Sequence, residues 1–549
     1  MSDTHPVLDL EAMGRQYLKR VRRNLPTARL YEEIVKNREG QIAHAGPVVV
    51  RTGRRYTELP PQDRFIVKGP VSEEKVYWKR HQVMSEYHFE GLVARIISYM
   101  QNREVYVQNV YACNDCDDCR IPIRIVTESA WHSLFARKMF TPEYDPEVFN
   151  NFSPAFSVVH IPGFHAKPET DGTNSHAFAL INMEQKIAAI AGTAHAGEIR
   201  HAVFSFVNYL LPHEAVLPMR CAVNIGKAGD TAVFIGREGS GKTTLSLDSE
   251  RILIGDHEHG WSDKGLFCFE RGGYARVLNL SEKEEPLLFD LTRKFGTILE
   301  NVAMDPDTRR IDLSDGILTQ NTRAAYSISH IPHAAERKVC GHPKNLFLLT
   351  CDAFGVMPPI SRLTPEQTLY GFLSGYTSRS IHAESGEVEL TSEFDMNFGA
   401  SSLTLPPAAY SGRLLEKIRK HNVRCWLVNT GWIGDPHGKA GRIPIEYSRA
   451  LIRAVLSGQM ETVGYETDPV FQFEIPKECP GLPARLLNPR TAASDPGEYE
   501  MRANRLAQAF TEAFEQFKDE MPDTMQDMLS GLLSIEKSFD FMDDFGFSL

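Results

Sequence analysis

The sequence predicts an α/β protein of two or three domains, one of which binds a nucleotide. Three observations support this prediction. The chain has 549 residues, enough to build more than one hydrophobic core. Apolar strand-like runs, such as 105–111 and 121–127, are interspersed with helical patterns such as 130–140. Finally, the run 236–244 reads GREGSGKTT, which has the phosphate-loop spacing G-x-x-x-x-G-K-[ST].

The context of this glycine-rich run favours a phosphate loop over a chance turn. Residues 231–235 form a short apolar strand pattern before it, and a helix pattern begins at Thr243 after it. A strand–loop–helix order lets successive backbone N–H groups converge on a phosphate. Lys242 is expected to reach the β- and γ-phosphates, with the Thr243 hydroxyl facing Mg²⁺. The predicted nucleotide-binding residues of the loop are Gly239, Gly241, Lys242, Thr243 and Thr244.

Composition excludes several classes of function. Hydrophobic residues make up 42% of the chain and charged residues 24%, the balance of an ordinary globular protein. The net charge of -11 argues against general nucleic-acid binding. The sequence has no apolar run long enough to cross a bilayer and no secretion signal at its start. Nine cysteines, an odd number, favour a reducing compartment. We therefore predict a cytoplasmic protein without membrane or nucleic-acid partners.

The first half of the chain is predicted to alternate strands and helices. The basic residues within 1–25 are interpreted as a solvated helix face, followed by a helix over 30–39 and a strand over 46–50. Between the strands 105–111 and 121–127 lies a C-x₂-C-x₂-C loop, formed by Cys113, Cys116 and Cys119. Three thiolates suit zinc or an iron–sulfur cluster, but no fourth cysteine follows at short range. Free thiols are favoured, and a metal site stays open.

In the second half, an apolar strand over 251–256 ends in Asp256, next to His257. An acid in this position after a phosphate loop typically holds the Mg²⁺ of the nucleotide. Residues 438–443 form a glycine-rich basic loop. An amphipathic helix is expected over 500–518, and the acidic tail that follows, rich in Met and Phe, is expected to be disordered in part.

Taken together, these landmarks resemble the ATP-dependent phosphoenolpyruvate carboxykinases from about Leu30 to about residue 518. The matching stretches are AWH at 130–132, LFAR at 134–137, NYLLP at 208–212, the phosphate loop, LIGD at 253–256, EHGW at 258–261, ENV at 300–302, NTR at 321–323, FLSG at 372–375 and NTGW at 429–432. The resemblance implies an N-terminal α/β substrate-side domain over 1–220, a C-terminal domain with the phosphate loop over 221–518 and an acidic tail over 519–549. It places the active site in the cleft between the two domains.

The resemblance also assigns roles to individual residues. Lys242, Thr243 and Thr244 fall on the family's phosphate and Mg²⁺ positions, and Asp256 on its Mg²⁺-associated acid. Glu300 and Arg323 fall near the transferred phosphate. Arg442, Ile443 and Ser448 fall on the adenine and ribose side. ATP with Mg²⁺ is the implied cofactor, with Mn²⁺ as a second metal to consider.

The substrate half departs from the family pattern. Where the family has T-G-R-S-P-K-D, residues 57–63 read TELPPQD, so that Leu59 replaces the arginine that grips oxaloacetate. The family's Y-x-G-E-x-K-K becomes HAGEIRH at 195–201. Its metal-binding lysine, histidine and aspartate fall on His201, Arg220 and His257. Losing a buried charged contact typically costs about 2–5 kcal/mol, and arginine does not normally bind metals.

These replacements lead to the functional prediction. The main hypothesis is an ATP-dependent phosphotransferase acting on an acceptor other than oxaloacetate, either a small molecule or a protein. In this hypothesis the catalytic residues are Lys242, Arg323, His257, His201 and Arg220, and the metal ligands Thr243, Asp256, His257 and His201. Two alternatives stay open: a carboxykinase that converts oxaloacetate and ATP to phosphoenolpyruvate, ADP and CO₂, and a regulatory protein that binds ATP without turnover.

Overall fold

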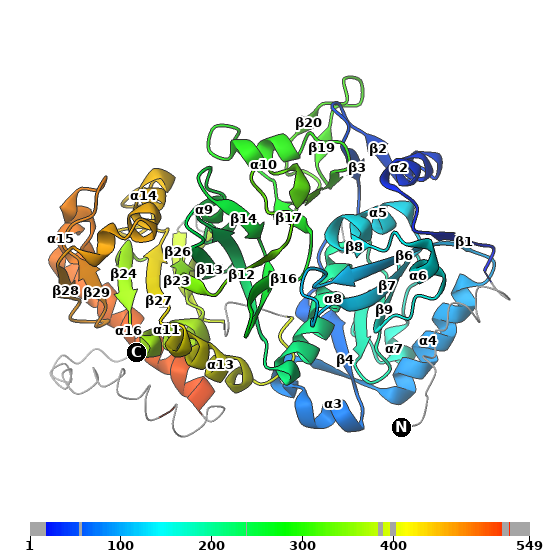
Figure 1. Ribbon diagram of the computed structural model, residues 1–549, viewed down its shortest axis with the longest axis horizontal. Helices are drawn as coiled ribbons and strands as arrows, with labels where there is room; N and C mark the ends of the chain where they lie inside the picture. Colours follow the sequence, from blue (N-terminus) through cyan, green and yellow to red (C-terminus); the bar gives the residue numbers. More distant parts are fainter. Residues whose placement is uncertain are drawn as a thin grey trace. The chain divides into compact units, whose positions relative to one another are not determined.

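The computed structural model describes residues 18–53, 57–237, 239–382, 388–395, 402–518 and Gln526 (Figure 1). The first 17 residues, Glu238 of the glycine-rich loop and the acidic tail apart from Gln526 lie outside the described residues. The fold is a mixed α/β fold, and the chain divides into two compact units. Unit 1 comprises Met1–Val216, Phe267–Val339 and Ser401–Leu405, and unit 2 comprises Leu217–Leu266, Cys340–Ala400 and Pro406–Leu549.

The main sheet of unit 1 has nine strands in the order β1-β6-β7-β9-β11-β10-β4-β5, with β8 beside β6. Its strands are β1 (Arg20–Arg23), β4 (Arg64–Lys68), β5 (Gln82–Ser85), β6 (Glu104–Ala112), β7 (Ile121–Thr127), β8 (Thr141–Pro142), β9 (Phe156–Ile161), β10 (Phe178–Asn182) and β11 (Ile187–Ala191). Strand side chains alternate between the two faces. Val159 of β9 therefore joins the core beneath α4 (Glu86–Met100), while Phe156 stacks at 4.1 Å on Phe206 of α8 (Gly197–Leu210).

The prediction of a helix near the N-terminus is wrong for residues 20–23. These residues form β1, which pairs in parallel with β6 from Arg20↔Glu104 to Arg23↔Val107. The edge of β6 offers unpaired backbone groups, and residues 20–23 pair with them. Arg22 contacts Glu104 and lies 3.5 Å from Glu33 of α2 (Thr27–Lys36). Backbone pairing and ion pairs thus determine the conformation of this basic segment.

A second sheet in unit 1 joins distant parts of the chain. Its order is β17-β21-β18-β3-β2. The strands are β2 (Gly40–Ile42), β3 (Val48–Val50), β17 (Gly272–Arg276), β18 (Ile298–Glu300) and β21 (Arg323–Ser327). The strand predicted over 46–50 is confirmed for residues 48–50, which pair in parallel with β18, with Val50 opposite Glu300. On the other side of β18, Glu300 lies opposite Arg323. This sheet therefore brings two of the predicted site residues together.

Unit 2 is built on an eleven-stranded sheet of order β22-β16-β15-β12-β13-β23-β27-β24-β29-β28, with β14 beside β12. The strands are β12 (Leu217–Ile225), β13 (Thr231–Gly236), β14 (Ile252–Gly255), β15 (Glu258–Ser262), β16 (Gly265–Cys268), β22 (Val339–Cys340), β23 (Pro343–Thr350), β24 (Ile360–Leu363), β27 (Arg424–Asn429), β28 (Tyr465–Thr467) and β29 (Glu474–Pro476). At its centre β13, β23 and β27 run in parallel.

Helices cover both faces of this central region. On one face, Phe347 of β23 and Val428 of β27 pack with Leu451 of α14 (Ile445–Leu456). On the other face, Leu427 packs in a cluster with Leu506 of α16 (Pro496–Lys518). The expected amphipathic helix over 500–518 is thereby confirmed as part of α16. Two further helices of unit 2 are α11 (Pro365–Ser374) and α13 (Pro407–Lys420). In the described part of the chain, no helix combines the length and the apolar character that a membrane span requires.

Candidate functional site

The glycine-rich loop connects a buried strand to a short helix, as the sequence predicts. The strand β13 ends at Gly236, and α9 (Lys242–Ser246) begins after Gly241. Gly239 and Gly241 have φ angles of +87° and +90°, which side chains with a Cβ rarely adopt. A Cβ on Gly236 would lie 2.8 Å from the carbonyl oxygen of Leu349. The three glycines are therefore required by backbone geometry.

Lys242 lies buried within this loop. Its exposed fraction is 8%, and its Nζ atom donates hydrogen bonds to the carbonyl oxygens of Gly236 and, at 2.9 Å, of Arg237. An ammonium group held inside the loop in this way is placed to meet an anion bound by the surrounding N–H groups. The loop therefore has the local form that the phosphate-loop spacing predicts.

Thr243 and Asp256 meet beside the loop. Strand β14 ends one residue before Asp256, and the Thr243 hydroxyl donates a 3.0 Å hydrogen bond to Asp256 Oδ2. A hydroxyl and a carboxylate oxygen side by side are hard donors, which suit Mg²⁺. The residues present thus fit the metal that a nucleotide requires.

A second contact network links the loop to the segment after β27. The Thr430 hydroxyl donates to the carbonyl oxygen of Ser240 at 3.1 Å. Arg442 donates through Nε to the Thr430 carbonyl at 2.7 Å and through Nη2 to that of Gly239 at 3.2 Å. Arg442 is therefore fixed next to the loop. Ile443 is 8% exposed and Ser448, within α14, is 1% exposed. The adenine and ribose roles of these residues stay predictions.

In unit 1, Glu300 is the centre of a buried polar cluster. Its carboxylate is fully buried, accepts a 2.8 Å hydrogen bond from the Tyr274 hydroxyl and lies 3.1 Å from His195 Nδ1. Burial, together with the charge of Glu300, raises the pKa of Tyr274 well above its usual value, so that the phenol stays a neutral donor. Arg323 lies over the Tyr274 ring at 5.4 Å and donates to Asn321 Oδ1 at 2.7 Å. Glu300 and Arg323 thus share one site.

Helix α8 contributes two buried ion pairs to the same unit. Arg64 binds both carboxylate oxygens of Glu198, at 2.9 and 2.7 Å. Burial would raise the pKa of Glu198, but the Arg64 charge and its hydrogen bonds outweigh burial and lower that pKa to about 2. Arg200 pairs in the same bidentate way with Glu270. The cation at position 200 is therefore already neutralised by a carboxylate.

Leu59 lies next to the first of these pairs. It is 1% exposed, and its backbone N–H donates to Glu198 Oε1 at 3.4 Å. Its side chain packs inside unit 1 and cannot bind an anion. The structure thus agrees with the sequence that no carboxylate-gripping arginine stands at this position.

The remaining predicted residues are distributed over both units. His201 follows Arg200 on α8 in unit 1, and its Nδ1 lies 3.4 Å from Ser205 Oγ. Arg220 lies on β12 opposite Glu258, and His257 immediately precedes β15, both in unit 2. Among the described residues, no three His, Cys, Asp or Glu side chains group closely enough to hold a metal ion. A metal shared by His201 and His257 stays a prediction. Cys113, Cys116 and Cys119 are free thiols.

The buried polar contacts of Tyr274, Glu270 and Arg64 were not predicted from the sequence. None of the three lies within a local motif, and each acquires its partner through contacts between distant strands and helices. His132 is fully buried in α5 (Ala130–Met139). Its Nε2 atom lies 2.8 Å from the carbonyl oxygen of Ala194, in the loop that carries His195. The buried AWH stretch therefore supports the loop that carries His195.

Comparison with known proteins gives a consistent result. The family model described as phosphoenolpyruvate carboxykinase matches residues 19–485. The phosphoenolpyruvate carboxykinase (ATP) of Pelobacter propionicus is 49% identical over 487 residues, covering 88% of this chain and 91% of that protein. The enzyme of the same name from Geobacter metallireducens is 47% identical, with 88% and 91% coverage. The one from Thermus thermophilus is 46% identical, with 92% and 96% coverage.

These relatives overturn the main functional prediction. The substitutions at Leu59, His201, Arg220 and His257 predicted an acceptor other than oxaloacetate, but the similarity extends over nearly the whole of proteins that are named as carboxykinases. The similarity of the entire chain outweighs the substitutions at these four positions. The prediction of a different phosphate acceptor is therefore wrong, and the alternative reaction is the better supported one.

Proposed function

The chain belongs to the phosphoenolpyruvate carboxykinase family, and from this membership we propose that it converts oxaloacetate and ATP to phosphoenolpyruvate, ADP and CO₂. The observation that carries the proposal is the 49% identity over 88% of the chain to an enzyme named for this reaction. In the reaction the C–C bond to the leaving carboxylate breaks, and its electron pair forms an enolate. The enolate oxygen then takes the γ-phosphoryl group as ADP leaves.

The nucleotide half of this reaction is assigned to the loop of unit 2. We assign the loop N–H groups and Lys242 to binding of the ATP phosphates. When a phosphate occupies the loop, the Lys242 ammonium group can exchange its hydrogen bonds to carbonyl oxygens for charge-assisted ones to the phosphate. Thr243 and Asp256 would hold Mg²⁺, which supplies charge neutralisation on the phosphates when bound. Arg442 is assigned to the nucleotide because its guanidinium is anchored on the loop by the Thr430 and Gly239 carbonyls.

The substrate half is assigned to unit 1. We assign Arg323 to binding of the negatively charged substrate. Tyr274 and Glu300 would fix the position of the Arg323 side chain. The buried side chain of Leu59 takes no part. Roles for His201, Arg220 and His257 in binding a second metal, Mn²⁺ included, stay predictions. The partners in this proposal are small molecules, and the cytoplasmic location stays a prediction.

The test is an assay of purified protein with oxaloacetate, ATP and Mg²⁺ or Mn²⁺, in which phosphoenolpyruvate is followed by ³¹P nuclear magnetic resonance. We expect product that depends on both substrates. The Lys242→Ala variant should lower the rate at least about 100-fold, as expected for removing a group that stabilises the transferring phosphate. Lys227→Ala, an exposed lysine in the turn before β13, is the matched control and should keep full activity.

Two outcomes would contradict the proposal. Binding of ATP without formation of phosphoenolpyruvate would show that the protein binds ATP but does not catalyse this reaction. Unchanged activity in Lys242→Ala would show that the loop does not hold the reacting phosphates, even if the reaction occurs.

A further inference from the structure

Unit 2 contains a cavity of about 770 Å³ on the face of its sheet that carries α11 and α16. Leu348 and Thr350 of β23 and Leu427 of β27 form its floor. Strand alternation places Phe347 and Leu349 on the opposite face, in the core beneath α14. The cavity is distinct from the glycine-rich loop, because none of the described residues within 236–244 lines it. Its volume falls in the range of small-molecule sites.

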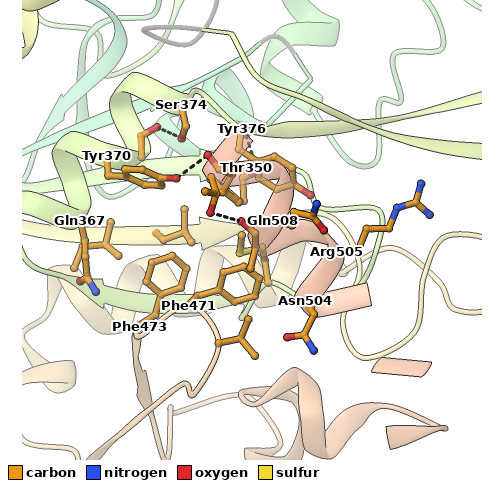
Figure 2. Close-up of a pocket in the computed structure, with 18 of the residues that line it drawn as sticks. Thr350, Gln367, Tyr370, Ser374, Tyr376, Phe471, Phe473, Asn504, Arg505 and Gln508 are labelled. Carbon is orange, nitrogen blue, oxygen red and sulfur yellow. Dashed lines mark hydrogen bonds between the residues drawn. The ribbon is translucent and has the colours of Figure 1, made fainter. Parts of the chain in front are cut away.

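The cavity wall is rich in aromatic rings. Phe471 and Phe473 stack on each other with ring centroids 5.7 Å apart, and Phe510 of α16 contacts Tyr370 at 5.9 Å and Tyr376 at 5.0 Å. In Figure 2 the rings of Phe471 and Phe473 form one side of the space, and the side chain of Arg505 extends away from them. Aromatic rings are attracted to further rings in stacked or edge-on geometry. The wall therefore favours a planar, aromatic guest.

Several polar groups of the wall already have a hydrogen-bond partner in the protein. Thr350 Oγ1 donates to the Tyr376 carbonyl at 2.9 Å, and the Tyr370 hydroxyl donates to the Phe510 carbonyl at 2.9 Å. Gln367 donates to the Gln472 carbonyl at 2.9 Å. Gln508 donates to Glu512 at 2.9 Å and Ser374 to the Gly371 carbonyl at 3.2 Å. These groups have little capacity left for a charged or strongly polar guest.

Asn504 is different. It is one of the residues that line the cavity, and its Oδ1 atom is buried and has no hydrogen-bond partner among the described residues. A buried amide oxygen without a partner costs stability, so such a group indicates a missing ligand or water. A hydroxyl suits an asparagine amide in either orientation, because it can donate to the oxygen or accept from the nitrogen.

We propose that this cavity is a second binding site, which takes an uncharged aromatic molecule of several rings with a hydroxyl group that hydrogen-bonds to Asn504. This site goes beyond the carboxykinase reaction and uses none of its residues. Rings of the guest pack against Phe471, Phe473 and Phe510, and the hydroxyl meets the amide on α16.

The probe is 6-hydroxyflavone, and flavone is its matched control because it lacks only the hydroxyl. Binding to the full chain is measured by calorimetry in saturating ATP and Mg²⁺, so that the nucleotide site is occupied. We expect 6-hydroxyflavone to bind about tenfold more tightly than flavone, the usual worth of one hydrogen bond to a buried group. Binding of the probe only when ATP is left out, or no binding of either compound, would overturn the proposal.

Two variants separate recognition from packing. Asn504→Leu keeps the size of the side chain, so the affinity for 6-hydroxyflavone should fall to that for flavone, with flavone unchanged. Ala507→Trp fills the cavity from α16 and should abolish binding of both compounds, while Glu515→Trp puts the same side chain at an exposed position of that helix and should change neither. Equal preference for the two compounds in wild type and Asn504→Leu would overturn the proposal. So would unchanged binding in Ala507→Trp with an intact melting transition.

Discussion

His160 and His132 are completely buried beneath the loop that carries His195. The Nε2 atom of His160 lies 3.0 Å from the Thr193 carbonyl oxygen, as that of His132 lies close to the Ala194 carbonyl. The two rings contact each other edge-on at 4.2 Å. Burial, opposed by the hydrogen bond to Thr193, lowers the pKa of His160 to about 4, and burial lowers the pKa of His132 well below 6.5. Both rings are therefore neutral at physiological pH.

This burial predicts a loss of stability in mild acid. In the unfolded chain His160 binds a proton below about pH 6.5, whereas in the folded protein it does so only below about pH 4. The unfolded state thus binds more protons in this window, and the free energy of unfolding falls as pH drops from about 6.5 to 4, by at most about 1.4 kcal/mol per pH unit for this residue. Urea unfolding of wild type and His160→Gln should show a shallower pH dependence in the variant.

The control for this experiment is His165→Gln, since that histidine is exposed. It should keep the wild-type dependence on pH. An identical slope in His160→Gln and wild type would show that the His160 ring is protonated in the folded protein.

Among the elements, the loop between β13 and α9 is the one whose form follows most directly from sequence. Its glycines are needed because of local backbone angles, and its strand and helix are contiguous with it. Gly239 and Gly229 both have positive φ, +87° and +78°, and a Cβ on either would meet nothing within 4 Å. They differ in place, because Gly229 lies in the turn between β12 and β13.

This pair gives a matched test of the loop. Gly239→Ala and Gly229→Ala should each lower the free energy of unfolding by about 1–2 kcal/mol, the cost of the left-handed conformation for alanine. Only Gly239→Ala should weaken ATP binding, roughly 5- to 30-fold if the strain is relieved by leaving the binding conformation. Calorimetric titration with ATP and Mg²⁺ measures this. Equal ATP affinity in both variants would remove Gly239 from the nucleotide site.

Other elements could be predicted only in part. The strands at 105–111 and 121–127 are confirmed, because a run of apolar and β-branched residues indicates a strand by itself. The run RVRR at 20–23 does not reveal its own conformation, because it pairs with β6, a strand about eighty residues away in sequence. The same holds for the site. Lys242 was found from a motif, whereas the contact of His195 with Glu300 depends on the second sheet of unit 1, which no local pattern encodes.

At the scale of the whole molecule, the family was identified from motifs spread over most of the chain, and that identification is confirmed. The predicted reaction was wrong because it rested on a few positions. Leu59 does lack the charge expected of a substrate-binding residue, and it is buried beside the Arg64–Glu198 pair. Substitutions of this kind change contacts within a site, but they do not change the fold that positions the rest of it. The domain boundaries near 220 and 518 stay a prediction.

The division into units predicts how a fragment behaves. Residues 1–216 lack β17, β18 and β21, so β3 loses its parallel partner and the cluster around Glu300 cannot form. We expect this fragment alone to unfold without a cooperative transition when it is heated and followed by circular dichroism. A fragment that extends to residue 339 restores these strands and is the matched comparison. A sharp transition in the shorter fragment would show that unit 1 folds without the second sheet.

The pairing of β3 with β18 has a consequence for biosynthesis. Val48 and Ile298 are register partners, although 250 positions separate them in the chain. At about 5–20 residues per second, a ribosome needs about 12–50 s to make the intervening segment. During that time the edge of the Val48–Val50 strand can pair with wrong partners. We therefore expect chaperones that bind nascent chains to bind this strand. Slower translation between these positions should therefore increase aggregation of newly made protein, even though the stability of the folded protein is unchanged.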